Sequence, residues 1–298
     1  HVPHPTDPET LITIRRYGVS ELNRYVNKIQ IHTAKVTKIG TQRTGERVDQ
    51  DIVIPGFSVS DDFSAVRTDT GDIVIVERRS SGEFFNFYVL KPNAIGGYVY
   101  DETKNQSVTN QFSAIEYSVV FLTGHKRVVI IYTAAETAQL GFVVYNLAGG
   151  MPIRGWFDAS DPEKQKDLDI VPTGVTCAND KGDANGILCF IDTFGSLNYQ
   201  FKYSTANIDD PKEFAKTKTM VEGVFQSPKG FERVKSIVSG DFTGVLYQNM
   251  QKATEPANSI YTCRHILEVY KKPSRFAYIT YTCEDFKVAA TDNISVPK

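Results

Sequence analysis

The chain has 298 residues, with 33 Lys and Arg against 35 Asp and Glu, and a formal net charge of −2. Like charges are scattered along it, which excludes a general polyanion-binding surface, so we expect no nucleic-acid partner. The longest plainly apolar run, residues 128–132, is far shorter than the roughly 20 residues that cross a bilayer, so we expect no membrane span.

Helical periodicity is scarce and is confined to three short segments. The first follows residues 1–19, which we expect to be partly irregular. There Ser20 would cap a helix whose apolar face contains Leu22, Tyr25, Val26 and Ile29. Ser160 and Asp210 each precede a proline by one or two residues, which predicts the starts of two further, very short helices.

The remainder of the chain reads as β-strands. Short runs of β-branched and aromatic residues are separated by clusters of Gly, Ser, Asn and Asp. The predicted strands are 72–76, 84–90, 128–132, 142–147, 187–191, 197–203, 243–247, 259–263 and 276–282.

A strand-turn-strand pattern recurs within this series. The first apolar residues of successive units are Ile73, Val128, Ile187 and Val245, at separations of 55, 59 and 58 residues. This spacing predicts an all-β, repeat-built, β-propeller-like single domain of about five blades over residues 1–298. A strand at 276–281 would begin a last unit, which N-terminal strands at 29–32 and 36–39 would complete. The alternative is two packed β-sandwiches, residues 1–150 and 151–298.

The four cysteines lie in the second half of the chain. Sequential pairing, Cys177 with Cys189 and Cys263 with Cys283, is favoured because each pair brackets a hairpin-like segment. The chain starts at His1 without an apolar targeting segment, which indicates a signal peptide already removed. We therefore expect a secreted, extracellular protein, with N-x-S glycosylation acceptors at Asn105 and Asn293.

One loop carries a recognisable tripeptide. Between Cys177 and Cys189, the residues Lys181, Gly182 and Asp183 resemble the Lys-Gly-Asp presented by disintegrin-type integrin antagonists. The resemblance implies integrin binding through the Asp183 carboxylate. The alternative is a polar hairpin loop turned by Asn185 and Gly186.

The same loop offers oxygen ligands for calcium, from Asp180, Asp183 and Asn185. We otherwise expect no cofactor and no resident metal.

Hydrolysis is a further hypothesis, because five-bladed propellers host glycosidases whose carboxylates converge in a central funnel. Acidic residues near predicted strand ends are Asp62, Asp72, Glu116, Asp192 and Asp241. His32, His125 and His265 are the histidines that would serve as a base within the fold. The sequence contains no G-x-S-x-G, H-E-x-x-H, P-loop or G-x-G-x-x-G motif, so binding is favoured over catalysis.

The preferred hypothesis is a secreted, non-enzymatic, lectin-like or protein-binding module that recognises a protein or glycan through loops on one face. The expected contacts are Trp156, the single tryptophan, and the loop containing Lys181, Gly182 and Asp183. The basic pairs 78–79 and 126–127 are interpreted as solvated protection of strand edges.

Overall fold

A computed structural model shows that the chain is all-β, as predicted. The structure describes residues 2–3, 10–21, 24–35, 48–58, 61–94, 97–110, 113–134, 140–157, 172–180, 183–193, 197–214, 218–226, 232–239, 242–252, 261–271, 274–284 and 287–290. The described residues form five antiparallel sheets and one short helix.

Each sheet is built from strands that follow one another in the sequence. The first contains β1 (Val2–Pro3), β2 (Thr10–Glu21), β3 (Arg24–Lys35) and β4 (Val48–Val53). The second contains β5 (Asp62–Arg67), β6 (Ile73–Arg78), β7 (Phe84–Pro92) and β8 (Tyr98–Thr109). The third contains β9 (Ala114–Leu122), β10 (Arg127–Ala134), β11 (Leu140–Asn146) and β12 (Ile153–Trp156). The fourth contains β13 (Pro172–Asn179), β14 (Gly186–Thr193), β15 (Leu197–Ser204) and β16 (Lys218–Gln226). The fifth contains β17 (Glu232–Ser239), β18 (Phe242–Lys252), β19 (Tyr261–Lys271), β20 (Ser274–Glu284) and β21 (Lys287–Ala290).

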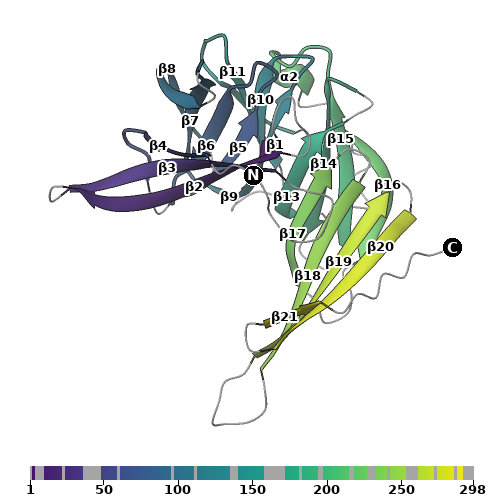
Figure 1. The fold of residues 1–298 in the computed structure, drawn as a ribbon. Helices are drawn as coiled ribbons and strands as arrows, with labels where there is room; N and C mark the ends of the chain where they lie inside the picture. Colours follow the sequence, from purple (N-terminus) through teal and green to yellow (C-terminus); the bar gives the residue numbers. More distant parts are fainter. Residues whose placement is uncertain are drawn as a thin grey trace.

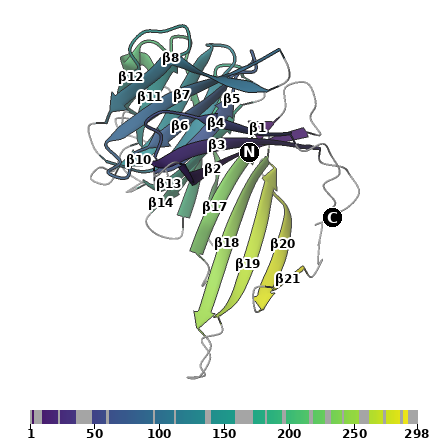
Figure 2. The same ribbon diagram turned by 60° about the vertical axis from the view of Figure 1, so that its left-hand side comes forward.

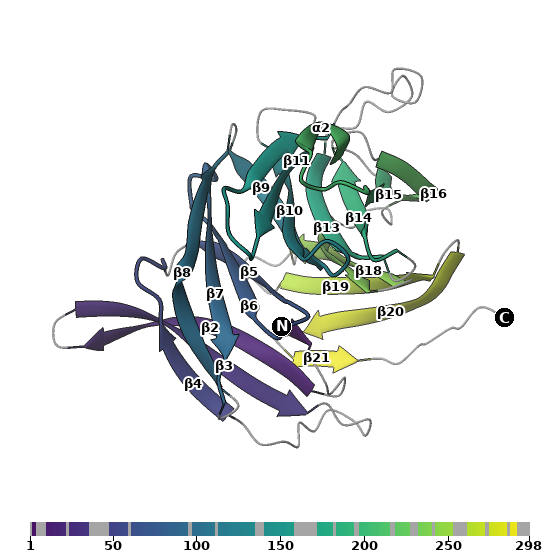
Figure 3. The same cartoon turned by 90° about the horizontal axis from the view of Figure 1, so that it is seen from above.

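Successive sheets meet through their first strands. β1 lies beside β5, β5 beside β9, β9 beside β13, and β13 beside β17. Figures 1 and 2 show the chain passing from the purple N-terminal sheet through the blue and teal sheets to the green and yellow C-terminal sheet. Seen from above, the sheets follow each other in chain order along an arc (Figure 3). The repeat in the sequence is therefore a repeat of sheets.

Apolar cores fill the spaces between neighbouring sheets. The second and third sheets each contribute side chains to two of these cores. In β6, Ile73 and Ile75 enter the core shared with the first sheet, whereas Val74 and Val76 enter the core shared with the third. All four side chains are fully buried. Because alternate residues of a strand point to opposite faces, a strand buried on both faces needs an unbroken apolar run.

The predicted strand pairs are confirmed as the second and third strands of their sheets. Ile73, Val128, Ile187 and Val245 lie in β6, β10, β14 and β18, the second strand in each case. The first sheet extends the series, since Ile12 in β2 lies 61 residues before Ile73. One expectation about the ends is wrong: β20 lies between β19 and β21, and the N-terminal strands form their own sheet.

The helix predicted after Ser20 is also wrong, because Ser20 lies in β2 and the residues from Arg24 onward form β3. The alternation of apolar residues decides in favour of a strand, since Ile29 and Ile31 in β3 are both buried in the core between the first two sheets. Residues 10–19, expected within an irregular segment, belong to β2.

The short helix predicted after Asp210 is confirmed as α2 (Pro211–Phe214). The Asp210 carboxylate caps it by accepting hydrogen bonds from the backbone N–H of Lys212 and Glu213, at 2.9 and 3.3 Å. The helix predicted after Ser160 lies outside the described residues.

A disulfide joins Cys177 to Cys189, as predicted. The two residues are direct partners across β13 and β14, with Cα atoms 4.1 Å apart. Cys263 and Cys283 are likewise direct partners, across β19 and β20, which is the register that the second predicted bridge requires. Their side chains lie outside the description.

No helix among the described residues is long and apolar enough to cross a membrane.

The Tyr203 hydroxyl provides a first prediction. It is fully buried, its ring centroid lies 4.1 Å from that of Phe157, and among the described residues it has no hydrogen-bond partner. An unsatisfied buried hydroxyl costs about 1–3 kcal/mol, so Tyr203→Phe should raise the free energy of unfolding in urea by about 1 kcal/mol. Tyr145→Phe is the matched control, because the Tyr145 hydroxyl donates to the Lys104 carbonyl at 2.7 Å, and this variant should be destabilised. A loss of stability in Tyr203→Phe would contradict the prediction.

Candidate functional site

Several turns gather at one end of the second, third and fourth sheets. In the third sheet, Arg127 lies opposite both Leu122 and Asn146, so the β9–β10 and β11–β12 turns share that end. The term turn face is used here for the described residues of four turns and one connection: 68–72, 123–126, 147–152, 180–185 and 205–210.

Polar contacts between the turns join the three sheets across the turn face. Lys126 forms an ion pair with Asp69, which links the third sheet to the second. The Gly124 N–H donates to the Ala184 carbonyl at 3.2 Å, which links the third sheet to the fourth. A Cβ atom on Gly124 would overlap Asn185 Oδ1 and lie 3.0 Å from the Ala184 carbonyl oxygen, so a larger residue there would displace the Asn185 side chain.

Two further contacts connect the β9–β10 turn to the segment after β15. His125 Nε2 lies 2.8 Å from the Thr205 carbonyl oxygen, and because a carbonyl only accepts, Nε2 carries the hydrogen. Arg127 donates from Nε and Nη2 to the two carboxylate oxygens of Asp209, at 3.0 and 2.8 Å. The hydrogen bond from Arg127 lowers the pKa of Asp209. The pair 126–127, interpreted from sequence as solvated edge protection, instead forms these cross-links.

Asp183 holds the β13–β14 turn together. Its carboxylate accepts hydrogen bonds from Ser204 Oγ at 2.6 Å and from the Asn185 N–H at 3.0 Å. Lys202 Nζ lies 3.1 Å from Asp183 and 2.9 Å from Asp180, so one ammonium group pairs with both acids and offsets one of their two negative charges. The hydrogen bonds from Ser204, Asn185 and Lys202 lower the pKa of Asp183 to about 2.

These contacts bear on the two ligand hypotheses for this loop. The Asp183 carboxylate, which integrin recognition would use, is bound within its own sheet. Lys181 and Gly182 lie outside the described residues. The two carboxylates of the suggested calcium loop are joined by Lys202, and no group of three or more His, Cys, Asp or Glu side chains that could hold a metal ion occurs among the described residues.

The β11–β12 turn presents Met151, whose side chain is 91 % exposed. The turn backbone is held by hydrogen bonds: Gly149 N–H donates to the Asn146 carbonyl at 3.0 Å, and Gln106 Nε2 to the Gly150 carbonyl at 2.9 Å. Lys104 Nζ reaches the Leu147 carbonyl at 2.8 Å. Positive φ angles at Gly149 and Gly150, 113° and 101°, let the chain reverse here. A large apolar side chain thus projects from a fixed turn.

Trp156 lies away from the turn face. In β12 it pairs with Gly141, at the opposite end of the third sheet from Arg127 and Asn146. Its ring packs edge-on against Tyr132, at a centroid distance of 5.6 Å, beside the core between the second and third sheets. The structure therefore does not bring Trp156 and Asp183 together, and a ligand contact at Trp156 stays a prediction.

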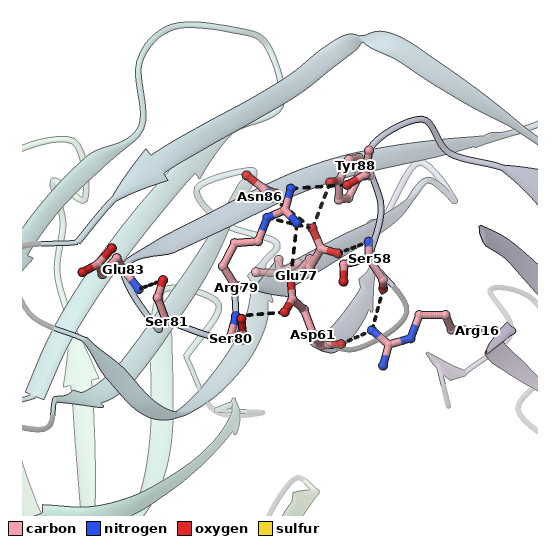
Figure 4. Close-up of polar contacts among 12 residues, drawn as sticks. Arg16, Ser58, Asp61, Glu77, Arg79, Ser80, Ser81, Glu83, Asn86 and Tyr88 are labelled. Atoms are coloured by element: carbon pink, nitrogen blue, oxygen red, sulfur yellow. Dashed lines mark hydrogen bonds and ion pairs between the residues drawn. The ribbon is translucent and has the colours of Figure 1, made fainter. Parts of the chain in front are cut away.

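A second polar site lies at the opposite end of the first two sheets, and no motif in the sequence pointed to it (Figure 4). Glu77 continues the alternation of Ile73 and Ile75 in β6 and is fully buried. Its carboxylate accepts hydrogen bonds from the Ser58 N–H at 2.6 Å, from Asn86 Nδ2 at 2.9 Å and from the Tyr88 hydroxyl at 3.0 Å. Burial, together with the Glu77 charge, raises the pKa of Tyr88.

Asp61 completes this carboxylate cluster, defined as Asp61, Glu77 and their donors. Arg79 lies between the two acids, with Nη1 at 3.3 Å from Asp61 and Nε at 3.8 Å from Glu77. Asp61 also accepts from the Ser80 N–H at 2.9 Å, and Arg16 reaches the Ser58 carbonyl at 2.9 Å from the first sheet. The cluster therefore secures the linker between β4 and β5 against β6 and β7. Its acids are occupied by internal donors, and Arg79 is part of a network rather than free edge protection.

The acids of the hydrolase hypothesis do not all gather at one place. Asp62 pairs with Arg78 at one end of β6, whereas Asp72 precedes the other end of the same strand. Glu116 is exposed in β9. Asp241 and the side chain of Asp192 lie outside the description, as do those of His32 and His265.

Sequence reasoning missed Glu77 and Asp61 because neither belongs to a motif. A signal was present at Glu77, since it follows four apolar residues at a position whose alternation directs it to the core. Asn105 is exposed in β8, and Asn293 lies outside the described residues.

Comparisons with known proteins identify no family. No protein-family model matches the chain, and no curated protein does. Among solved structures, AofleA from Arthrobotrys oligospora is similar at 11 % sequence identity and a TM-score of 0.46, over 95 % of this chain and 89 % of that one.

The Asp183 contacts predict an acid-dependent loss of stability. The folded pKa, about 2, lies below the ordinary value near 4, so the stabilisation is complete above pH 4 and is lost between pH 4 and pH 2. The side chain is 28 % exposed, which reduces the expected contribution to about 1 kcal/mol. In urea titrations, Asp183→Asn should therefore be less stable than the unmodified protein at pH 5, with the difference vanishing near pH 2. A constant difference over this range would show that the Asp183 charge is not responsible.

The carboxylate cluster predicts a strong effect at Tyr88. Tyr88→Phe removes a hydroxyl that donates to a fully buried carboxylate. Hydrogen bonds to charged groups contribute about 1.5–3 kcal/mol, so the free energy of unfolding should fall by about 2 kcal/mol. Tyr203→Phe is the control, because it removes a buried hydroxyl that lacks a partner among the described residues. Equal effects of the two substitutions would contradict the role assigned to Glu77.

Proposed function

We propose that this chain is a secreted, non-enzymatic binding protein that recognises a protein or glycan ligand through the turn face. Its scaffold is one repeat-built domain in which the five sheets act as propeller blades. Binding is favoured over catalysis because the acids with the most extensive hydrogen bonding, Glu77 and Asp183, are bound by internal donors.

The observation that carries the proposal is the cross-linking of turns from three successive sheets. The contacts Lys126–Asp69, Gly124–Ala184 and Arg127–Asp209 fix these turns before any ligand arrives. A surface that is already ordered loses little conformational entropy on binding, which favours affinity. Loops held by a rigid scaffold are also the usual position of binding residues.

Met151 supplies an exposed apolar contact on this surface. At 91 % exposure it is the most exposed of the large apolar side chains in the described part of the chain. Because its turn is fixed by Gln106 and Lys104, the thioether is presented in a restricted region. Methionine side chains adapt to irregular partner surfaces, which suits a contact residue.

Secretion is supported by the Cys177–Cys189 disulfide, because such bonds persist in oxidising compartments. The facing register of Cys263 and Cys283 agrees with a second bridge. Counting free thiols in denatured, unreduced protein from the secretory pathway tests both bonds together.

Ligand binding is tested with two substitutions in the same sheet. The purified protein is applied to an immobilised glycan panel and to a panel of extracellular protein domains, and the best ligand is titrated. Met151→Lys should weaken binding at least tenfold, which is about 1.4 kcal/mol. Ile115→Lys is the matched control, because Ile115 is 46 % exposed at the far end of the third sheet, and it should leave affinity within about twofold.

Three outcomes contradict this proposal. The first is an absence of binding to either panel, and the second is an equal loss in both variants. The third is turnover of chromogenic glycosides, which would favour the hydrolase hypothesis. Loss of integrin-dependent cell adhesion with Asp183→Ala, but not with Met151→Lys, would place the contact at the 180–185 turn of this face instead of at Met151.

A further inference from the structure

β8 contains the N-x-S acceptor Asn105-Gln106-Ser107 in the last strand of the second sheet. One edge of β8 pairs with β7. Along the other edge no further strand of this sheet occurs among the described residues, and there Gln50 of β4 binds the backbone of Tyr98. Asn105 and Ser107 are both exposed, whereas Val108 is buried. The acceptor and its recognition hydroxyl therefore both face outward.

The backbone around Asn105 departs from a regular ladder. Phe87 is the partner of Gln106, but Val89 is the partner of Asp101, so β8 has three extra residues between these two pairs. Asp101 closes a local turn by accepting from the Thr103 N–H at 3.1 Å and from the Thr103 hydroxyl at 2.6 Å. Asn105 thus lies on a bulge, where a large substituent does not compete with pairing to β7.

The neighbours of Asn105 hold this bulge against the third sheet. Gln106 turns toward the third sheet and donates to the Gly150 carbonyl at 2.9 Å, and Lys104 reaches the Leu147 carbonyl at 2.8 Å. Asn105 Nδ2 donates one hydrogen to the Tyr100 hydroxyl. An amide nitrogen has two hydrogens, so one remains for substitution while the contact with Tyr100 is kept.

We propose that Asn105 carries an N-linked glycan that covers the outer edge of β8. The inference rests on the proposed secretion of the chain. In the modification, Nδ2 loses a proton and forms a bond to the anomeric carbon of an oligosaccharide. The donor is a polyprenyl-diphosphate-linked sugar, whose diphosphate leaves with the electron pair of the broken C–O bond. The glycan would shield the stretch of this edge between Tyr98 and Thr109, whose backbone groups are bound by Gln50 and Arg154, and so hinder its pairing with another chain.

Expression of the full chain behind a cleavable secretion signal in mammalian cells tests the site. Peptide mass spectrometry before and after N-glycosidase treatment should find Asn105 modified in most molecules. Asn105→Gln and Ser107→Ala should each abolish that glycan. Ser107→Thr is the matched control, because it keeps the acceptor motif at the same position and should keep the glycan.

Asn105 found unmodified in chains that have entered the secretory pathway, whether released or retained, overturns the inference. Modification at Asn293 alone does the same. The test distinguishes this inference from the proposed function. Unmodified Asn105 with intact ligand binding contradicts only the glycan inference. Modified Asn105 without ligand binding contradicts only the proposed binding function.

The proposal that the glycan covers the edge of β8 is tested separately, by aggregation. Enzymatically deglycosylated protein should form aggregates faster than untreated protein at the same concentration, as measured by light scattering. Equal rates would overturn the covering role.

Discussion

The burial of β6 and β10 on both faces is the constraint from which the rest of the architecture follows. In β10, Val129 and Ile131 enter the core toward the fourth sheet, while Val128 and Ile130 enter the core toward the second. A sheet with two apolar faces needs a neighbour on each side, because an uncovered face would leave several large side chains in water. The sheets therefore pack in series, and chain order sets the order of packing.

Serial packing also explains where the polar groups lie. Glu77 lies on the same face of β6 as Ile73 and Ile75, so its carboxylate is buried in the space between the first two sheets. A buried carboxylate is tolerated only with donors around it, and Ser58, Asn86 and Tyr88 provide them. The linker from β4 to β5 is consequently fixed by hydrogen bonds at the position where the chain passes from one sheet to the next.

At the other end of the sheets, antiparallel strand order places turns of neighbouring sheets side by side. The contacts of Gly124, His125 and Arg127 then connect segments that are 60 to 82 residues apart in the sequence. The Cys177–Cys189 bond stiffens the hairpin that carries one of these turns, and Asp183 closes it. The turn face is thus ordered by its own polar contacts, which is the property that the proposed binding function uses.

Local pattern was sufficient for several features of this protein. Short runs of β-branched and aromatic residues and the turn residues between them identified the central strand pairs, and the spacing of Ile73, Val128, Ile187 and Val245 indicated repeated units. The proline after Asp210 predicted α2, and the bracketing of a hairpin predicted the Cys177–Cys189 bond. These features depend on residues close in the chain, where propensity and period act directly.

The helix predicted after Ser20 failed because Ile29 belongs to the strand alternation of Ile29 and Ile31, and packing of these residues against the second sheet selected the strand. The partners of Glu77, the separation of Trp156 from Asp183, and the cross-links of the turn face were likewise decided only by the tertiary structure. Each depends on contacts between residues far apart in the chain. Sequence by itself determined an all-β chain of repeated strand pairs. The packing of the sheets in series decided which side chains meet, because the side chains on each sheet face contact residues of a different sheet, far away in the sequence.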